Sequence, residues 1–302
     1  SFDGKISEAD LYQLGIVDEP FKTMGTAHLT LSTNMDDRYF VDGRIDDMVI
    51  SDSKGNYTTS NLSVNILSTA DTTHAAIEGG DFTLKADAQG SYKTTLSGVN
   101  KISKALRRQI RDKEINQAEL KSKLPVAHLV LNTGNGNILS SILAKNGIKF
   151  KTANIDVKSS PVEGLNGGAI IDSLVYKDYT IDSLNLVLNS QDNKLKYNLA
   201  LLNDAQNSYP YKGYIDGTFY EKGILANVKI LDTSERTAID LGLRAAMHGE
   251  GIMSSITTQQ SILGYKKFDV NDANYVYIGK DRRISANVKL LATDGAGAEI
   301  YT

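Results

Sequence analysis

The chain repeats segments in which apolar and polar residues alternate, and this alternation restricts its fold more than any other feature. Residues 27–33 (AHLTLST) match residues 127–133 (AHLVLNT) at five of seven positions. Residues 226–231 (ANVKIL) match residues 286–291 (ANVKLL) in the same way. Successive side chains of a β-strand point to opposite faces, so each segment predicts a strand with one apolar and one polar face. Repeated strands of this kind favour an extended sheet over a single enzyme pocket.

The same period-two pattern continues between the repeats, and turn residues such as Gly, Asn and Asp separate the segments. Short spacings between strands are typical of antiparallel hairpins. We therefore expect a mainly β fold, an elongated antiparallel β-repeat sheet with two or three short helices. Its apolar face could close in two ways, as a half-pipe groove of the β-taco kind or as a flattened sandwich.

Three segments break the alternation and predict helices. Residues 7–15 begin with a Ser cap and early acids and end on Gly. Residues 103–121 are rich in helix formers, and Ile102, Leu106 and Ile110 lie four residues apart. Residues 138–147 form a shorter amphipathic segment that ends on Gly147. The last two segments lie between the two copies of the longer repeat.

The position of these helices suggests two modules, with a first β-repeat over residues 1–125 and a second over residues 126–302. The segment 101–123 at their junction holds eight Lys or Arg and three Asp or Glu, a net charge of +5, although the whole chain carries −3. A solvated helix face is the simpler interpretation of this segment. Contact with anionic headgroups or with an acidic partner is the alternative.

Composition excludes several classes of function. The chain has no Cys, which removes disulfides, thiolate metal sites and a cysteine nucleophile. Its net charge of −3 gives no reason to expect a nucleic-acid partner. No Trp is present and the apolar residues are mostly aliphatic, so we expect an aliphatic interior. The sequence begins without Met or a signal peptide and ends within an alternating segment, so we expect an internal piece of a longer protein.

No constellation of residues indicates catalysis. His28 and His128 occupy equivalent repeat positions, which predicts two strand-surface residues rather than a catalytic base. No nucleotide loop, metal-ligand spacing or nucleophile motif is present. We therefore predict a protein that is not an enzyme and has no cofactor and no metal. The tyrosines at 209, 211, 214 and 220 predict an edge strand with Tyr on its surface, or a glycan-binding face.

The segment from Leu124 to Leu202 resembles the TamB/AsmA-like proteins of Gram-negative bacteria, in the form seen in Bacteroidetes. The resemblance is carried by Leu124-Pro125 before a strand, the 138–147 helix, the IKFK segment at 148–151 and the GLNGG segment at 164–168, and it continues from Gly213 to Leu231. It implies an open β half-pipe in a long periplasmic protein of the cell envelope that is anchored in a membrane through other segments. Such proteins are associated with lipid transport between membranes, with outer-membrane biogenesis and with the assembly or secretion of outer-membrane proteins. This sequence departs from them in showing neither an N-terminal anchor nor a C-terminal partner segment.

The primary functional hypothesis is a structural module with an apolar groove that binds lipid acyl chains, with an outer-membrane barrel protein as a second expected partner. The expected groove lining consists of the alternating aliphatic residues Leu62, Val64, Ile66, Leu184, Leu186, Leu188, Val228, Ile230, Val288 and Leu290. The alternative is a surface or periplasmic adhesin, or a glycan-binding module.

Overall fold

The computed structural model describes residues 2–53 and 55–302 and confirms a mainly β fold, with 59% strand and 12% helix in one large antiparallel sheet. Among the described residues there are 22 strands and three helices. The chain divides into two compact units. Unit 1 comprises residues 1–97, 125–159 and 167–183, and unit 2 comprises residues 98–124, 160–166 and 184–302. The module boundary expected at residue 125 stays a prediction about the sequence repeat.

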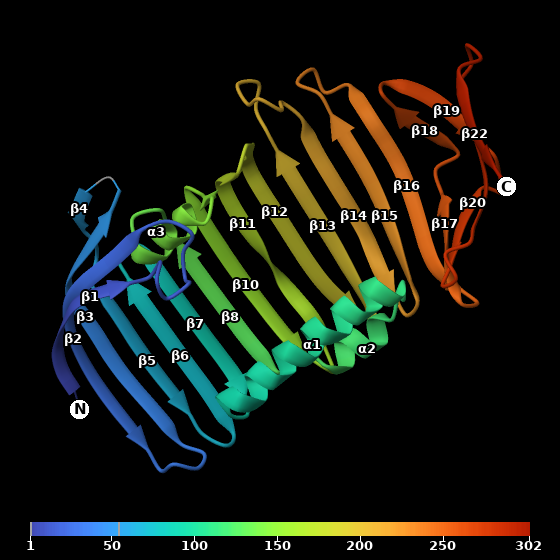
Figure 1. Cartoon of the computed structure of the whole chain (residues 1–302). Coiled ribbons are helices and arrows are strands. Elements are labelled where there is room, and N and C mark those ends of the chain that lie inside the picture. The colour runs from blue at the N-terminus through green and yellow to red at the C-terminus, as the bar shows by residue number, and fades with distance from the viewer. Residues whose placement is uncertain (1, 54) are drawn as a thin grey trace. The chain divides into compact units, whose positions relative to one another are not determined.

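Unit 1 contains the strands of the first repeat and of the segment after the helices (Figure 1). Its strands are β1 (Phe2–Asp10), β2 (Phe21–Thr33), β3 (Tyr39–Asp52), β4 (Gly55–Thr58), β5 (Leu62–Ser68), β6 (Thr72–Gly79), β7 (Phe82–Gln89), β8 (Ala127–Thr133), β9 (Ile148–Lys149) and β10 (Thr152–Ser160). Antiparallel pairing runs from β1 through β2, β3, β5, β6, β7 and β8 to β10. Strands β11 (Gly164–Tyr176) and β12 (Tyr179–Gln191) contribute residues to both units.

Unit 2 begins with a meander of adjacent hairpins (Figure 1). Its strands are β13 (Lys194–Leu202), β14 (Lys212–Tyr220), β15 (Gly223–Leu231), β16 (Thr237–His248), β17 (Gly251–Ile256), β18 (Gln260–Leu263), β19 (Lys266–Val270), β20 (Tyr275–Gly279), β21 (Ile284–Leu291) and β22 (Gly297–Tyr301). β13 to β16 pair in sequence order. Beyond β16 the pairing crosses over, with β17 on β20, β18 on β16 and β19 on β21. The turn before β13 places Asp192 and Asn193 at positive φ, 51° and 58°, as a two-residue hairpin turn requires.

Cross-strand register keeps the apolar residues of each unit on one face. In unit 1, one row across six strands consists of Val41, Ile66, Ala75, Ala86, Leu129 and Val157. In unit 2, a row across four strands consists of Leu199, Ile215, Val228 and Leu241. The rows one residue away carry polar groups, for example Asn198, Asp216 and Asn227. A slip of one residue would move every side chain to the other face, so this register is strongly selected.

Little of this apolar surface is fully buried. Among the described residues, eleven apolar side chains are buried, and five of those are alanines. The accessible surface is 18,000 Å² for a 32.9 kDa chain. Two separate globular proteins of half this mass would together expose roughly 15,000 Å². The apolar faces are therefore covered by partial packing rather than by a second sheet.

The main core of unit 1 forms where α3 (Ile138–Lys145) packs on the sheet. Val17, Phe21 and Ile50 are buried together, with Leu11, Ile138 and Ile142 packed against them. A β-bulge lies between β2 and β3, where Asp47 has φ of 51° and the register shifts. Bulges increase strand twist and bend, which directs the end of this hairpin toward the helix.

The structure confirms the 138–147 helix as α3, capped by Asn137 and followed by Gly147 at φ 76°. The prediction for residues 103–121 is correct only in part. Helix α1 (Tyr92–Asp112) begins eleven residues before the expected start, and Lys113 at φ 52° separates it from α2 (Gln117–Ser122). Ser91 supplies the missed start signal, because its hydroxyl accepts from the Thr94 amide at 3.3 Å.

The helix expected over residues 7–15 is wrong. Residues up to Asp10 belong to β1, which pairs with β2, and residues 11–15 form a turn. Pairing with a distant strand has overridden the local capping signal. Residues 209–220 are also not an edge strand, because β14 is paired on one side with β13 and on the other with β15.

The Val17–Phe21–Ile50 cluster predicts a local stability test. Ile50→Ala removes a fully buried side chain, so the free energy of unfolding should fall by about 2–5 kcal/mol. Leu31→Ala is the control, since Leu31 is 60% exposed on β2. Its cost should be less than about 1 kcal/mol. Urea unfolding of the full chain measures both, and equal effects would contradict the assignment of this cluster as the core of unit 1.

Candidate functional site

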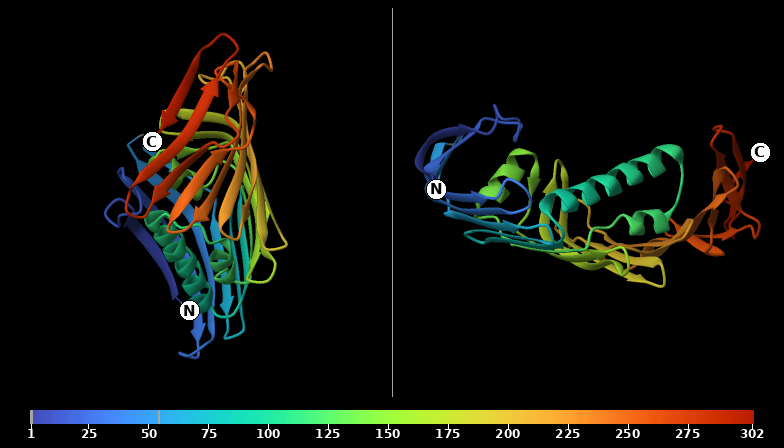
Figure 2. Two further views of the ribbon diagram at one scale, coloured as in Figure 1. Left: turned by 90° about the vertical axis from the view of Figure 1, so that its right-hand side faces the viewer. Right: turned by 90° about the horizontal axis from the view of Figure 1, so that it is seen from below.

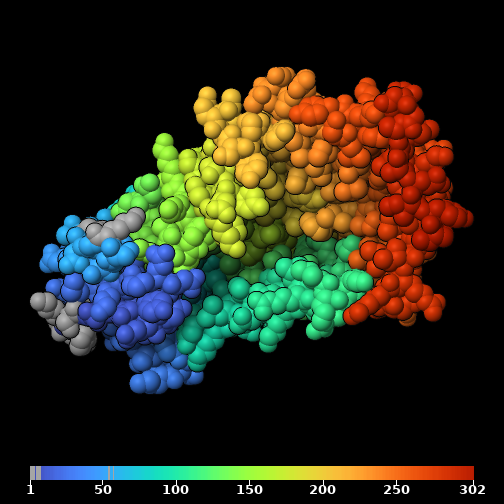
Figure 3. Space-filling view, turned by 45° about the horizontal axis from the view of Figure 1, so that its top comes forward, coloured from blue at the N-terminus to red at the C-terminus, as the bar shows by residue number. Residues whose placement is uncertain are grey.

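An apolar cavity in unit 2 is the best-formed candidate site. It has a volume of about 330 Å³ and lies between the helices and the apolar face of the sheet. The helical wall includes Leu106, Ile110, Ile115 and Leu120, and the sheet contributes Leu195 and Phe219. The volume falls in the range of small-molecule sites. Figure 2 shows α1 and α2 on the same side of the strands, and Figure 3 shows a hollowed strand surface beside α1.

The sheet side of this cavity is built by register between β13 and β14. Leu195 is paired with Phe219, and the rings of Phe219 and Tyr197 lie 5.3 Å apart. Gly217, the cross-strand partner of Tyr197, leaves room for that ring, because a Cβ there would lie 2.5 Å from the Tyr197 hydroxyl oxygen. The hydroxyl donates to the Leu225 carbonyl at 3.0 Å. Burial raises the pKa of Tyr197, which keeps this donor protonated.

A polar network holds α1 and α2 together at the edge of the cavity. The Gln109 amide nitrogen donates to the Asn116 carbonyl and to the Glu119 carboxylate, both at 3.0 Å. Glu119 also accepts hydrogen bonds from Lys123 and Arg108. Hydrogen bonds from Lys123, then Arg108 and Gln109, lower the pKa of Glu119 to about 2. The carboxylate therefore stabilises the corner between the helices in its ionised form.

One polar atom on the wall is left without a partner. Gln117 is 8% exposed, and its side-chain oxygen has no hydrogen-bond partner among the described residues. Leaving a buried acceptor unsatisfied costs about 1–3 kcal/mol. A hydroxyl or amide donor entering from the cavity would remove that cost.

The structure places all ten predicted lining residues on strands and leaves each half-buried. Leu62, Val64 and Ile66 lie on β5 in unit 1, and the other seven lie on β12, β15 and β21 in unit 2. Val228 shares a row with Ile215 of β14 and Leu241 of β16. Ile230 is paired with Ile239 of β16, and Val288 with Ile300 of β22. None of the ten lines the cavity under α1 and α2. Their role as a groove lining stays a prediction.

The predicted lining does not include the residues that line this cavity on the sheet side, which are Gly164, Leu165, Ser190, Leu195 and Phe219. Leu195 belongs to an alternating segment that is visible in the sequence. The contribution of Phe219 depends on the pairing of β13 with β14 and on the helices above them. Those are non-local features, so no signal within the strand itself identifies the cavity.

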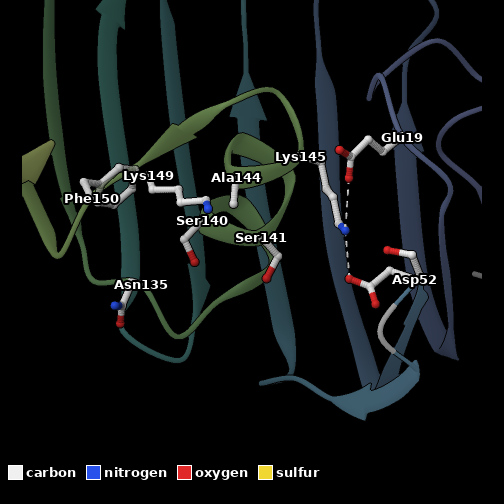
Figure 4. Close-up of a pocket in the computed structure, with 10 residues that line it drawn as sticks. Glu19, Asp52, Asn135, Ser140, Ser141, Ala144, Lys145, Lys149 and Phe150 are labelled. Carbon is white, nitrogen blue, oxygen red and sulfur yellow. Dashed lines mark hydrogen bonds and ion pairs between the residues drawn. The ribbon is translucent and has the colours of Figure 1, made fainter. Parts of the chain in front are cut away.

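A second, polar pocket lies in unit 1 beside α3 and has a volume of about 710 Å³ (Figure 4). Lys145 extends between Asp52 at 3.0 Å and Glu19 at 3.4 Å. The hydrogen bond with Asp52 is the largest of the effects that raise the pKa of Lys145. Lys145 is thus engaged by two carboxylates and ties α3 to β3, and a second lysine, Lys149, also lines the pocket (Figure 4).

Histidines lie on the polar face of unit 1, as the sequence predicts for positions 28 and 128. His128 contacts Asp156 at 2.8 Å on the neighbouring strand, and His28 lies 4.0 Å from Asp46. His74 contacts Asp87 at 2.6 Å in the same manner. These are cross-strand contacts between histidine and aspartate on an exposed surface. Among the described residues, no group of three or more His, Asp or Glu side chains could hold a metal ion.

The four tyrosines of the alternative hypothesis are spread along the chain. Tyr209 and Tyr211 lie in the loop before β14, whereas Tyr214 and Tyr220 lie on β14 itself. Six residues of strand place the last two about 20 Å apart. Tyr220 accepts a hydrogen bond from Arg244 at 3.2 Å. This spread gives no support to a compact tyrosine platform for a sugar.

Comparisons with known proteins leave the chain without an assigned family. No family model, no curated protein and no solved structure matches it. The resemblance to TamB/AsmA-like proteins therefore rests on sequence pattern alone. None of the helices in the described part of the chain is both long enough and apolar enough to span a membrane.

The network around Glu119 predicts a pH dependence of stability. The ordinary pKa is 4.5 and the folded value is about 2, so the carboxylate contributes its full stabilisation above pH 4.5. That contribution should be lost as the pH falls from 4.5 toward 2. Glu119→Gln removes this contribution at every pH. The difference in free energy of unfolding between the unchanged protein and the variant should therefore shrink as the pH falls through this window. Urea unfolding from pH 7 to pH 2.5 measures the difference, and a constant difference would contradict the lowered pKa.

Proposed function

We propose that this chain is a non-enzymatic lipid-binding module of a cell-envelope protein, in which the apolar faces of the sheet hold acyl chains during transport between membranes. The observation that carries the proposal is the register-matched apolar face, which is half-buried rather than covered by a second layer. At about 25 cal/mol per Å², leaving such surface in contact with water is costly. Contiguous apolar surface of this extent is typical of a binding site.

The chemistry of the face favours aliphatic ligands. Its rows consist of Leu, Ile, Val and Ala, with few aromatic rings and few polar atoms. Such a surface offers dispersion contacts and exclusion of water, and both suit alkyl chains of different lengths. The cavity under α1 and α2 adds a partly covered segment of about 330 Å³ to the face in unit 2.

The wider setting of the proposal comes from the resemblance to TamB/AsmA-like proteins. Because of that resemblance, the proposal includes a periplasmic location, a membrane anchor in other segments and an outer-membrane barrel protein as a partner. The resemblance also extends to outer-membrane protein assembly. Of lipid and protein as cargo, the apolar face favours lipid, because alkyl chains have no polar backbone groups that need hydrogen-bond partners.

A pair of substitutions on one strand tests the proposal. Val228 lies on the apolar face of β15 with Ile215 and Leu241, so Val228→Asp should place a carboxylate among the bound chains. Affinity for a fluorescent fatty-acid analogue should fall by about 10-fold or more, because a charge near an alkyl chain is poorly solvated. Fluorescence titration of the full chain measures this.

Leu225→Asp is the matched control. Leu225 lies on the same strand, but its partners are Thr218 and Arg244 on the polar face. The affinity of this variant for the probe should change by less than about 2-fold, because a charge on a solvated surface has only a small effect. Circular dichroism establishes that both variants fold. A protein that binds no fatty-acid probe and carries no lipid in native mass spectrometry would overturn the proposal.

A further inference from the structure

Two hollows of opposite character adjoin beside helix α2, and all of their lining residues belong to unit 2. The first is the apolar cavity of about 330 Å³ between the helices and the sheet. The second is a polar hollow of about 700 Å³ between α2 and the turns that lead into β13 and β15. Gln117 and Lys121 line both. A ligand that fills the two hollows together therefore needs one apolar part and one polar part.

The apolar cavity has room for a single alkyl chain. An engineered cavity of about 150 Å³ with aliphatic and aromatic walls holds one benzene molecule. The cavity under α1 and α2 is about twice as large and matches a chain of about twelve carbons. Its walls are mostly aliphatic, so the contacts they offer suit such a chain. The volume excludes a second chain of the same length.

Lys121 places a cation at the boundary between the two hollows. Its stem passes close to Gly164 of the apolar cavity, where a Cβ atom would lie 3.7 Å from the Lys121 Cε atom. Its ammonium group donates to the neutral side-chain oxygen of Asn193 at 2.8 Å. An ammonium group has three N–H donors, so Lys121 retains donors for an anionic group. Lys123, by contrast, is paired with the carboxylate of Glu119.

Gln117 is the second residue that the hollows share. Its backbone N–H donates to the Glu221 carbonyl at 3.0 Å, which ties the start of α2 to the turn before β15. Its side-chain oxygen is buried and has no donor among the described residues. A hydroxyl group of the ligand would supply that donor and remove the cost of an unsatisfied acceptor. Lys121 and Gln117 together thus favour a ligand in which a hydroxyl lies near an anionic group.

The outer part of the polar hollow has no excess of either charge. Lys194 lines it together with the carboxylates of Asp192 and Glu221, and all three side chains are exposed. Complementary potentials select partners at such a surface. A head group that carries charges of both signs matches it better than one with several negative charges.

We propose that the two hollows together bind a monoacyl glycerophospholipid. The acyl chain occupies the apolar cavity, the phosphate contacts Lys121 and the free glycerol hydroxyl donates to Gln117. The inference rests on the proposed function, because it assigns a ligand class to one part of the lipid-binding surface. A diacyl lipid has a second chain for which the cavity has no room, and a fatty acid has no hydroxyl for Gln117.

Isothermal titration calorimetry of the full chain tests the proposal with lauroyl lysophosphatidylethanolamine and monolauroylglycerol, each below its micelle concentration. The two probes share a chain and a glycerol backbone, and only the first has a phosphate. The unchanged protein should bind the lysophospholipid about 10-fold more tightly, because hydrogen bonds between charged groups are stronger than those between neutral groups. Equal affinities for the two probes would overturn the proposal.

Lys121→Gln should lower the affinity for the lysophospholipid by about 10-fold, since it removes the cation that contacts the phosphate. The affinity for monolauroylglycerol should change by less than about 2-fold, because that probe has no phosphate. Lys196→Gln is the matched control, which removes the same charge from an exposed lysine of β13 outside the lining of both hollows. Equal effects of the two substitutions on lysophospholipid binding would exclude the assigned contact.

Leu106→Trp tests the apolar cavity separately. Leu106 lies on the cavity wall and is 46% exposed, so a larger ring there can occupy the cavity without crowding a packed core. The affinities for both probes should fall together by about 10-fold or more, because the chain loses its space. Unchanged binding of both probes would show that the chain lies elsewhere. Circular dichroism checks the fold of each variant.

Val228→Asp separates this inference from the proposed function, because Val228 lies outside the lining of both hollows. This variant should bind the lysophospholipid within about 2-fold of the unchanged protein, since its new charge is remote from the ligand. If the fatty-acid probe responds to Val228→Asp but the lysophospholipid does not bind, this inference fails and the proposed function stands. If only the lysophospholipid binds, with dependence on Lys121, the acyl-binding role of the open face fails instead.

Discussion

The register between neighbouring strands is the interaction on which the rest of this structure depends. Backbone hydrogen bonds align Leu199 with Ile215 and Val228, and the same alignment places Asn198 beside Asp216 on the other face. Because side chains alternate with a period of two, each added strand extends both faces at once. The fold thus obtains a large apolar surface without enclosing a large core.

The helices cover part of that apolar surface in each unit. In unit 1, α3 completes a small core with Phe21 and Ile50, and its Lys145 is tied to Asp52. In unit 2, α1 and α2 cover the paired Leu195 and Phe219 and leave a cavity between themselves and the strands. The Gln109–Asn116–Glu119 network fixes the angle between these two helices. The rest of each apolar face stays half-exposed, which is the basis of the lipid-binding proposal.

The strands could be predicted from the sequence because their signal is local, and β5, β12, β15 and β21 contain the ten alternating residues as expected. The elements that depend on distant partners could not be predicted in this way. The Ser cap and final Gly of residues 7–15 favour a helix locally, but pairing with β2 makes most of that segment a strand. Phe219 shows the same limit for the site, since Leu195 and Ile115, which line the same cavity, come from other parts of the chain. Alternation predicts which face of the sheet is apolar, and only tertiary packing decides where helices cover that face.

The pairing of β13 to β16 in sequence order determines how far the effect of a substitution spreads along the sheet. Each of these strands is hydrogen-bonded to the strands beside it. In the described part of the chain no second sheet packs on them, and the contacts that reach farther come from the helical segment, where Ile115 donates to Met247 and Gln117 to Glu221. Stability in such an array is close to a sum of nearest-neighbour terms. A substitution in one hairpin therefore perturbs that hairpin and its immediate neighbours, while amide protons farther along keep their protection from hydrogen exchange. Hairpins built in this way can diverge in sequence independently, as long as each conserves the alternation that its two neighbours require.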